Sequence, residues 1–223
     1  MHDDSVPAAL SFPSLSPLLI VHADDALIAI DKPAGLLSVP GRGADKADCA
    51  ASRVQAQFAD AQTVHRLDMA TSGLLLFARG AAMQRALSVM FEAREVIKHY
   101  EAVVEGQVEH DAGEIALPLL ADWPRRPRQQ VDRLRGKPSL TLYRVLQRDA
   151  ATHTTRLALQ PLTGRTHQLR VHLLAIGHPI AGDALYATGA APTAGRLMLH
   201  ATRLELQHPL TSQALVLTSA APF

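Results

Sequence analysis

Hydrophobic and polar positions along the chain change their period several times, which predicts a mixture of strands and helices. Short runs rich in Leu, Val and Ile predict strands at residues 27–30, 64–68, 74–78, 97–104, 140–146, 155–159, 197–206 and 215–217. Helical spacing predicts helices over residues 45–58, with Asp45 as N-cap, over 81–94 and over 166–176. The alternation changes phase near residues 201–203, which predicts a β-bulge.

Strands outnumber helices, and neither an internal repeat nor a Ser/Gly-rich linker divides the chain. The pattern therefore predicts an α+β fold, with a mainly antiparallel sheet and a few helices in two lobes around a cleft. Residues 1–17 contain Pro7, Pro13 and Pro17 without a sustained period, and we expect a loosely ordered lead-in there. Residues 18–223 are expected to form a single domain.

Composition narrows the class of protein. Of 223 residues, 48% are apolar and 19% are charged, which is enough apolar material for a core and excludes disorder of the whole chain. There is neither a secretory leader nor an apolar run of the roughly 18 residues that a membrane span needs. The single cysteine, Cys49, forbids an internal disulfide and disfavours a thiolate metal site. We expect a soluble, cytoplasmic protein.

Charge is balanced over the chain but not locally. The formal net charge is +1, whereas residues 122–138 hold six basic and two acidic residues. A cluster of this kind suits a phosphate backbone, because each contact releases condensed counterions. A solvated basic loop would have the same composition, so both interpretations stay open.

The first stretch with residues that could take part in catalysis is 65–73, HRLDMATSG. Strand alternation would place Arg66 and Asp68 on one face, so that both charges look into one cleft. The guanidinium stabilises the charged form of the carboxylate, which suits a nucleophile better than a general acid. A purely structural Arg–Asp pair at a strand end is the alternative.

The second stretch is residues 163–172, TGRTHQLRVH. Thr163 or Thr166 could cap the following helix, and Arg165 would project from the helix N-terminus, where anions are favoured. His167 and His172 are five positions apart and do not share a helix face, so a zinc site is disfavoured. Arg165 could also be a plain surface residue.

Two aromatic residues could contact a nucleobase. Tyr100 lies in the predicted strand 97–104 beside a basic pair and could pack in the core, stack on a base or carry a proton. Trp123 lies in the basic segment and could stack on a base or pack under its own loop.

Together these stretches resemble the RluA-type pseudouridine synthases. HRLDMATSGLLL is similar to the catalytic motif of the family, IKHYEAVVEG to its tyrosine strand, and LTGRTHQLRVHLLAIGHPIAGDALY and LMLHATRLELQHP to later blocks. DKPAGLLSVPG and LLADWPRRP resemble the dual-specificity branch. That branch lacks the N-terminal S4 domain of others, and we expect none here.

The resemblance implies a bipartite, mainly antiparallel sheet with a central RNA-binding cleft. It implies that Asp68 is the catalytic aspartate, that Tyr100 is the active-site tyrosine, and that Arg165 pairs with Asp68. Arg66 matches the residue that replaces the flipped uridine in the RNA helix. We also expect substrate contacts from seven further residues: His65, Thr71, Arg125, Arg126, Arg128, His167 and Arg170.

The implied reaction breaks the N1–C1′ bond of uridine, rotates the uracil and rejoins it through C5. Because no group enters or leaves, we expect no cofactor and no metal. The expected partners are tRNA and 23S rRNA stem-loops, with no membrane, no protein partner and a monomeric chain. The alternatives are a single-specificity synthase for tRNA or rRNA, a non-catalytic RNA-binding module, and a hydrolase that would release free uracil.

Overall fold

The computed structural model describes residues 18–41, 43, 46–187 and 195–223. The expected lead-in 1–17 and the expected cap Asp45 lie outside these residues. The helices are α1 (Ala50–Gln55), α2 (Gly80–Glu92) and α3 (Gln168–Ala175), with a 3₁₀ turn at Trp123–Arg125. The strands are β1 (Leu19–Ala23), β2 (Leu27–Lys32), β3 (Ala61–Thr63), β4 (Ser72–Arg79), β5 (Ile97–Glu105), β6 (Ala112–Ala116), β7 (Leu119–Ala121), β8 (Gln129–Val131), β9 (Leu140–Asp149), β10 (Thr154–Pro161), β11 (Leu199–Gln207) and β12 (Ala214–Thr218).

Ten strands form one sheet in the order β1-β2-β4-β11-β5-β10-β9-β6, with β3 beside β4 and β12 beside β11. Among the described residues, every pairing in this sheet is antiparallel except the short parallel contact between β4 and β11. β7 and β8 form a separate two-stranded hairpin. The predicted α+β fold with a mainly antiparallel sheet is confirmed.

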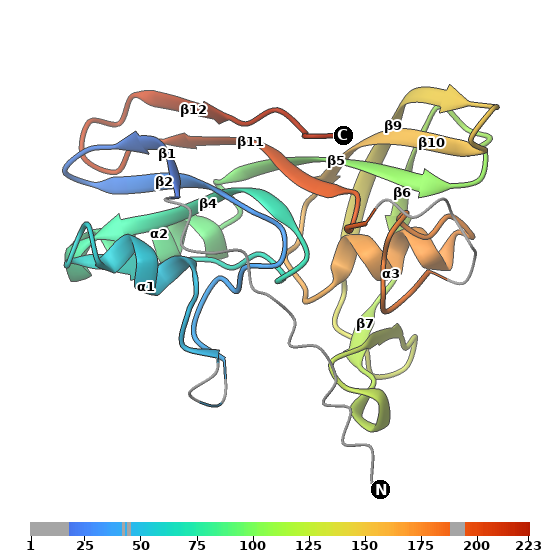
Figure 1. Ribbon diagram of the computed structural model, residues 1–223, viewed down its shortest axis with the longest axis horizontal. Helices are drawn as coiled ribbons and strands as arrows, with labels where there is room; N and C mark the ends of the chain where they lie inside the picture. The colour runs from blue at the N-terminus through green and yellow to red at the C-terminus, as the bar shows by residue number, and fades with distance from the viewer. Residues whose placement is uncertain (1–17, 42, 44–45, 188–194) are drawn as a thin grey trace, which may run out of the picture.

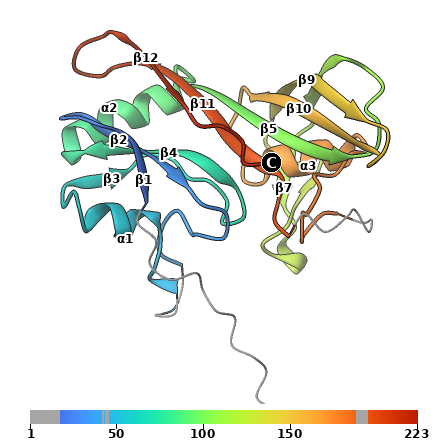
Figure 2. The ribbon, with the colours of Figure 1, turned by 45° about the horizontal axis from the view of Figure 1, so that its top comes forward.

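The sheet carries two hydrophobic cores. The first surrounds β2, β4, α1 and α2 and includes Phe77, and the second surrounds β5, β10 and α3 and includes Leu157 and Leu173. Figure 1 shows α1 and α2 beside one half of the sheet and α3 beside the other. β5 and β11 run through both halves (Figure 2). Tyr100, in the middle of β5, packs against both cores.

The two halves meet where β4 approaches β11. His200 and Ala201 of β11 pair with Ser72 and Gly73 of β4. Gly73 has a φ of +104°, and a Cβ there would lie 2.4 Å from the Ala201 carbonyl oxygen. Only glycine permits this approach. The register between β11 and β5 shifts between Ala201 and Arg203, which confirms the predicted bulge.

Three of the predicted elements differ in extent. The helix expected at 45–58 begins only at Ala50, because Cys49 is extended and caps it through the Ser52 N–H. The helix expected at 166–176 begins at Gln168, because His167 adopts a left-handed conformation with a φ of 54°. Residues 64–68 were expected as a strand but form a loop. In the described part of the chain, none of the helices is both long and apolar enough to cross a membrane.

Candidate active site

A cavity of about 890 Å³ opens between the two halves. Its walls come from the loop between β3 and β4, from β5, from the loop after β10 and from the start of α3. The charged and polar side chains that line it include Arg66, Asp68, Arg94, Lys98, Tyr100, Arg165, His167 and Arg170. Residues from both predicted motifs therefore line one site.

The loop that carries Asp68 is fixed by hydrogen bonds on both sides of the carboxylate. The Ser38 hydroxyl donates to the carbonyl oxygen of Leu67 (2.7 Å) and accepts from its N–H (3.0 Å). On the other side, the Gly35 N–H donates to the Met69 carbonyl (2.8 Å). These bonds replace strand pairing, which is why residues 64–68 do not form the expected strand. Asp68 itself remains about one-quarter exposed.

Lys32 ties the same loop to β2 from inside the protein. Its side chain is fully buried, and Nζ donates to the carbonyl oxygens of Pro33 (2.9 Å), Leu36 (2.8 Å) and Met69 (3.1 Å). Burial lowers the pKa of Lys32 to about 7, while the negative charge of Asp68 opposes this shift. Three carbonyl acceptors match the three N–H groups of an ammonium. Lys32 thus anchors the Asp68 loop to β2 through three hydrogen bonds.

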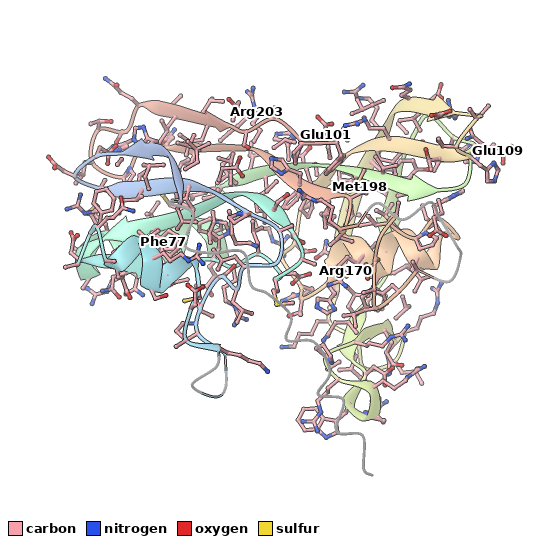
Figure 3. The ribbon with its side chains drawn as sticks, viewed as in Figure 1. Phe77, Glu101, Glu109, Arg170, Met198 and Arg203 are labelled. Carbon is pink, nitrogen blue, oxygen red and sulfur yellow. The ribbon has the colours of Figure 1, made fainter. Side chains whose placement is uncertain are left out.

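Asp68 is paired with Arg170. Nη1 of Arg170 donates to Oδ2 of Asp68 at 3.3 Å, while its Nε and Nη2 donate to Asp183 at 2.7 Å each. The Arg170 and Asp183 side chains are almost completely buried. The guanidinium is therefore held by a bidentate ion pair and presents its remaining edge to Asp68. Figure 3 shows Arg170 at the end of α3 that faces the other half of the molecule.

The expected pair between Asp68 and Arg165 was wrong. Arg165 is exposed at the mouth of the cavity, and its Nε donates to the Pro138 carbonyl at 3.3 Å. The physical reason is the late start of α3, because Arg165 lies in the preceding loop while Arg170 lies in the first turn of the helix. Arg170 had been expected only as a substrate contact.

His167 links the site to the basic hairpin. Its Nε2 lies 3.8 Å from Oδ2 of Asp68, and its Nδ1 lies 2.7 Å from the hydroxyl of Tyr186. That hydroxyl also accepts the backbone N–H of Gln129 at 2.7 Å. Burial lowers the pKa of His167, so a neutral ring is favoured. Tyr186 therefore connects β8 to the start of α3.

Tyr100 faces the cavity from the central strand β5. Burial, together with the nearby negative charge of Asp68, raises the pKa of Tyr100 well above its usual range. The phenol is therefore protonated at neutral pH. A direct role for a Tyr100 phenolate as the base is disfavoured by these surroundings.

His65 and Thr71 line the cavity. The His65 ring stacks on Phe91 with centroids 4.6 Å apart, and its Nε2 accepts the backbone N–H of Leu76 at 2.9 Å. Burial lowers the pKa of His65 to about 3, so the ring is neutral. Thr71 is buried, and its N–H donates to the Asp68 carbonyl. Both residues support the Asp68 loop. Arg66, by contrast, is exposed at the cavity mouth, where the sequence placed it.

The basic segment 122–138 contains the turn that joins β7 to β8, β8 itself and the turn that follows β8. Arg125 pairs with the buried Asp122 (2.7 Å), and the guanidinium of Arg126 stacks on Trp123 at 3.9 Å from the ring centroid. Arg128 lies over the Tyr186 ring at 5.2 Å. Pro127 of the same turn lines the cavity. The hairpin thus brings a cationic surface beside the cavity mouth.

Sequence reasoning missed three residues of the site: Lys32, Asp183 and Tyr186. A lysine next to the apolar run 27–30 was a signal for a buried cation. Asp183 follows Gly182, whose φ of +73° marks a tight turn, but nothing in the spacing pointed to Arg170 as its partner. The described residues contain no group of three His, Cys, Asp or Glu side chains that could hold a metal ion.

Comparison with known proteins identifies the family. The family model described as RNA pseudouridylate synthase matches residues 26–175, more than half of the chain. The chain belongs to the RNA pseudouridylate synthase family. This membership makes it an isomerase, and the matched region contains Asp68, Tyr100 and Arg170.

Two curated relatives of this pseudouridylate synthase carry the same name, "Dual-specificity RNA pseudouridine synthase RluA". The protein of Pasteurella multocida is 52% identical over 194 residues, which are 86% of this chain and 88% of the relative. The protein of Escherichia coli K12 is 47% identical over 190 residues, which are 85% of this chain and 86% of the relative.

Solved structures of pseudouridylate synthases share the fold. Human RNA Pseudouridylate Synthase Domain Containing 1 superposes with a TM-score of 0.77 at 28% identity, covering 92% of this chain and 84% of that one. Human RNA Pseudouridylate Synthase Domain Containing 4 gives 0.72 at 26% identity, covering 92% and 88%. The expected pseudouridine synthase fold is confirmed.

Proposed function

We propose that this pseudouridine synthase has dual specificity and modifies uridines in the anticodon stem-loop of tRNA and in a hairpin loop of 23S rRNA. The curated relatives named above, which match most of the chain, are described as dual-specificity enzymes. The observation that carries the catalytic part is the Asp68 carboxylate, held opposite Arg170 in a cavity large enough for a nucleoside.

Asp68 begins the reaction at C1′ of the ribose. Its carboxylate adds to C1′ while the N1–C1′ bond breaks, or it takes a proton from the sugar to give a glycal; both routes free the uracil for rotation. C5 of the rotated uracil then bonds to C1′ as the bond from Asp68 to C1′ breaks or, in the glycal route, as Asp68 returns its proton to the sugar. The proton on C5 is lost and N1 takes up a proton, so the product is an isomer of uridine. The anchors at Ser38, Gly35 and Lys32 keep the carboxylate in place during both halves of the reaction.

Arg170 orients the carboxylate and stabilises its negative charge before the substrate arrives. Because two of its nitrogen atoms are already committed to Asp183, the guanidinium cannot swing away when the ribose enters. Asp183 is therefore a positioning residue that acts through Arg170.

Tyr100 acts near the end of the reaction. Its raised pKa keeps the phenol protonated, so the C5 proton passes to a water molecule that the Tyr100 hydroxyl orients. The ring lies in the cavity wall and can also pack against the uracil.

The target uridine must leave its stack to reach Asp68, which costs a few kcal/mol. Arg66 is exposed at the cavity mouth, two residues before Asp68, and it fills the space that the base vacates. Arg125, Arg126 and Arg128 of the hairpin contact the phosphates of the stem, and Arg165 lies on the same rim.

We further propose a single catalytic domain over residues 18–223 that acts as a monomer in the cytoplasm, without a cofactor or a membrane. The location follows from the expected substrates, which occur in the cytoplasm, and the lack of a cofactor follows from an isomerisation in which N1 gains a proton as C5 loses one.

The test uses two synthetic RNAs, a tRNA anticodon stem-loop and a 23S rRNA hairpin, each carrying tritium at C5 of the target uridine. Dual specificity predicts tritium release and pseudouridine in both RNAs. Modification of one RNA alone would establish a single-specificity enzyme. Free uracil in place of pseudouridine would contradict the assignment as an isomerase.

A further inference from the structure

Lys98 lines the catalytic cavity, and the mechanism above does not use it. It lies on β5 two residues before Tyr100, so strand alternation puts both side chains on the cavity side of the sheet. Lys98 is partly buried, and burial together with the nearby charge of Arg94 lowers its pKa. Within the described residues, no carboxylate or other hydrogen-bond partner meets its ammonium group.

On the opposite face of the same sheet, two basic side chains contact carboxylates. His99, the next residue on β5, meets Glu205 at 2.9 Å. Arg156 on β10 meets Glu101 at 2.9 Å. These two cations on the opposite face are matched by carboxylates of the protein, whereas Lys98 in the cavity is not.

The surroundings of Lys98 are positive rather than neutral. Arg66, Arg94 and Arg165 also line the cavity, and none of them forms an ion pair with an acidic residue among the described part of the chain. The acidic residues in the lining are Glu92 and Asp68, and Asp68 is paired with Arg170. The three arginines are exposed, whereas the Lys98 side chain is partly buried and lacks an anionic partner among the described residues.

Gly164 lies next to the ammonium group of Lys98 and leaves it uncovered. This glycine does not have a positive φ, so its backbone does not require the absence of a side chain. A Cβ at residue 164 would meet just one atom within 4 Å, Nζ of Lys98 at 3.8 Å. A longer side chain at this position would cover the ammonium group. The loop after β10 therefore leaves Nζ accessible.

We propose that Lys98 binds a backbone phosphate next to the flipped uridine, and that Gly164 keeps this phosphate subsite open. The proposal rests on the proposed function, since it requires an RNA substrate with its target base in the cavity. Lys98 and Tyr100 are separated by about 7 Å along the strand. That spacing lets one residue contact the base while the other contacts the phosphate of the same or the adjoining nucleotide.

The first experiment compares wild-type protein with Lys98→Met, Lys98→Arg and a matched control, Arg85→Met. Arg85 is an exposed cation of α2 that does not line the cavity. Lys98→Met should raise the Kd and KM for the stem-loop RNA about tenfold and leave kcat within about threefold. The salt slope of binding should fall by about 0.7–0.9. Lys98→Arg should restore most of the affinity, and Arg85→Met should change neither quantity.

The second experiment removes the charge from the RNA instead. A methylphosphonate replaces, in turn, the phosphate on the 5′ side and on the 3′ side of the target uridine. At one of these positions the wild-type enzyme should lose about tenfold in affinity, while Lys98→Met loses nothing further. The proposal would be overturned if Lys98→Met still lowered the affinity tenfold on both methylphosphonate RNAs. It would also be overturned if Lys98→Met lowered kcat and left KM unchanged.

Two additional measurements separate a phosphate contact from a structural role of Lys98: the melting temperature of Lys98→Met and the RNA affinity of Gly164 variants. Lys98→Met should not lower the melting temperature, because the ammonium group has no partner among the described residues to lose; a clear decrease would show a structural role instead and overturn the proposal. Gly164→Leu should reproduce the loss of affinity with Lys98 in place, and Gly164→Ala should not. If the wild-type protein formed no pseudouridine, the proposed function would fail, while Kd and the salt slope would still report on Lys98.

Discussion

Nη1 of Arg170 lies 3.3 Å from Oδ2 of Asp68, although 102 residues separate them in the sequence. One residue comes from the loop between β3 and β4, and the other from the first turn of α3. The contact therefore forms only when the two halves of the sheet are assembled. Because Arg170 also donates two hydrogen bonds to Asp183, its guanidinium is held in place and in turn holds the Asp68 carboxylate.

This relationship predicts the effect of Arg170→Lys. Lysine keeps the positive charge but cannot bridge two carboxylates with fixed geometry. We expect turnover to fall by at least about 100-fold, since a displacement of about 1 Å at a reacting group has this effect. Binding of the stem-loop RNA should change little. Single-turnover kinetics and filter binding measure the two quantities.

Arg156→Lys is the matched control. Arg156 also holds a carboxylate, that of Glu101, but it does not line the cavity. Its turnover should stay within about twofold of wild type. Turnover of Arg170→Lys at the wild-type level would show that the contact with Asp68 has no catalytic role.

Tyr100→Phe separates binding from proton loss. The variant keeps the ring in the cavity wall and removes the hydroxyl that orients the water. We expect about 100-fold or more slower release of tritium from C5, which is typical for the loss of general acid–base assistance, with the Kd for RNA unchanged. Tyr143→Phe is the control, because Tyr143 lies on β9 outside the cavity lining. Equal release rates for wild type and Tyr100→Phe would exclude this role.

The hairpin surface predicts a change in salt dependence. Arg125→Ala combined with Arg126→Ala should weaken RNA binding and reduce the salt slope by up to about two, because two phosphate contacts are lost. Arg85→Ala combined with Arg144→Ala removes the same charge from exposed sites outside the cavity lining. This control should retain the wild-type slope. An unaltered salt slope in the hairpin variant would show that the segment does not contact the RNA.

His65 predicts a pH dependence of stability. Its pKa is about 3 in the folded protein, against 6.5 as the ordinary value. Because the folded pKa is lowered, the stabilisation is complete above pH 6.5 and is lost as pH falls from 6.5 toward 3. At pH 5 the loss amounts to about 2 kcal/mol. His65→Gln, which does not titrate and can still accept the Leu76 N–H, should lack this decrease.

Urea unfolding at pH 7 and pH 5 measures the difference. Other buried histidines titrate equally in both proteins, so their contribution cancels. His110→Gln, at an exposed position, should show the same pH dependence as wild type. A decrease between pH 7 and pH 5 that is as large in His65→Gln as in wild type would contradict the buried, neutral state of His65.

Much of the fold could be predicted because most of the long strands of the sheet have their own apolar run. The predicted runs 74–78 and 97–104 match β4 and β5 closely, and the phase change near residue 201 marked a real bulge. The sequence did not predict five strands: β1, β3, β6, β7 and β8. Three of them, β3, β7 and β8, have three residues each, which are too few to show a period.

The site was harder to predict than the fold. Asp68, Tyr100 and Arg66 do line the cavity, as their motifs indicated. The sequence did not show whether Arg165 or Arg170 pairs with Asp68, because both occur in one motif and the answer depends on where α3 begins. That start is set by the left-handed backbone of His167, a conformation that is uncommon for any residue other than glycine.

The most direct test of the central claim is Asp68→Asn, assayed on stem-loop RNA with tritium at C5 of the target uridine. The amide keeps the size of the side chain but can neither add to C1′ nor take a proton from the sugar. We predict RNA binding close to that of wild type and no tritium release above background. Release at the wild-type rate would contradict the assignment of Asp68 as the group that starts the reaction.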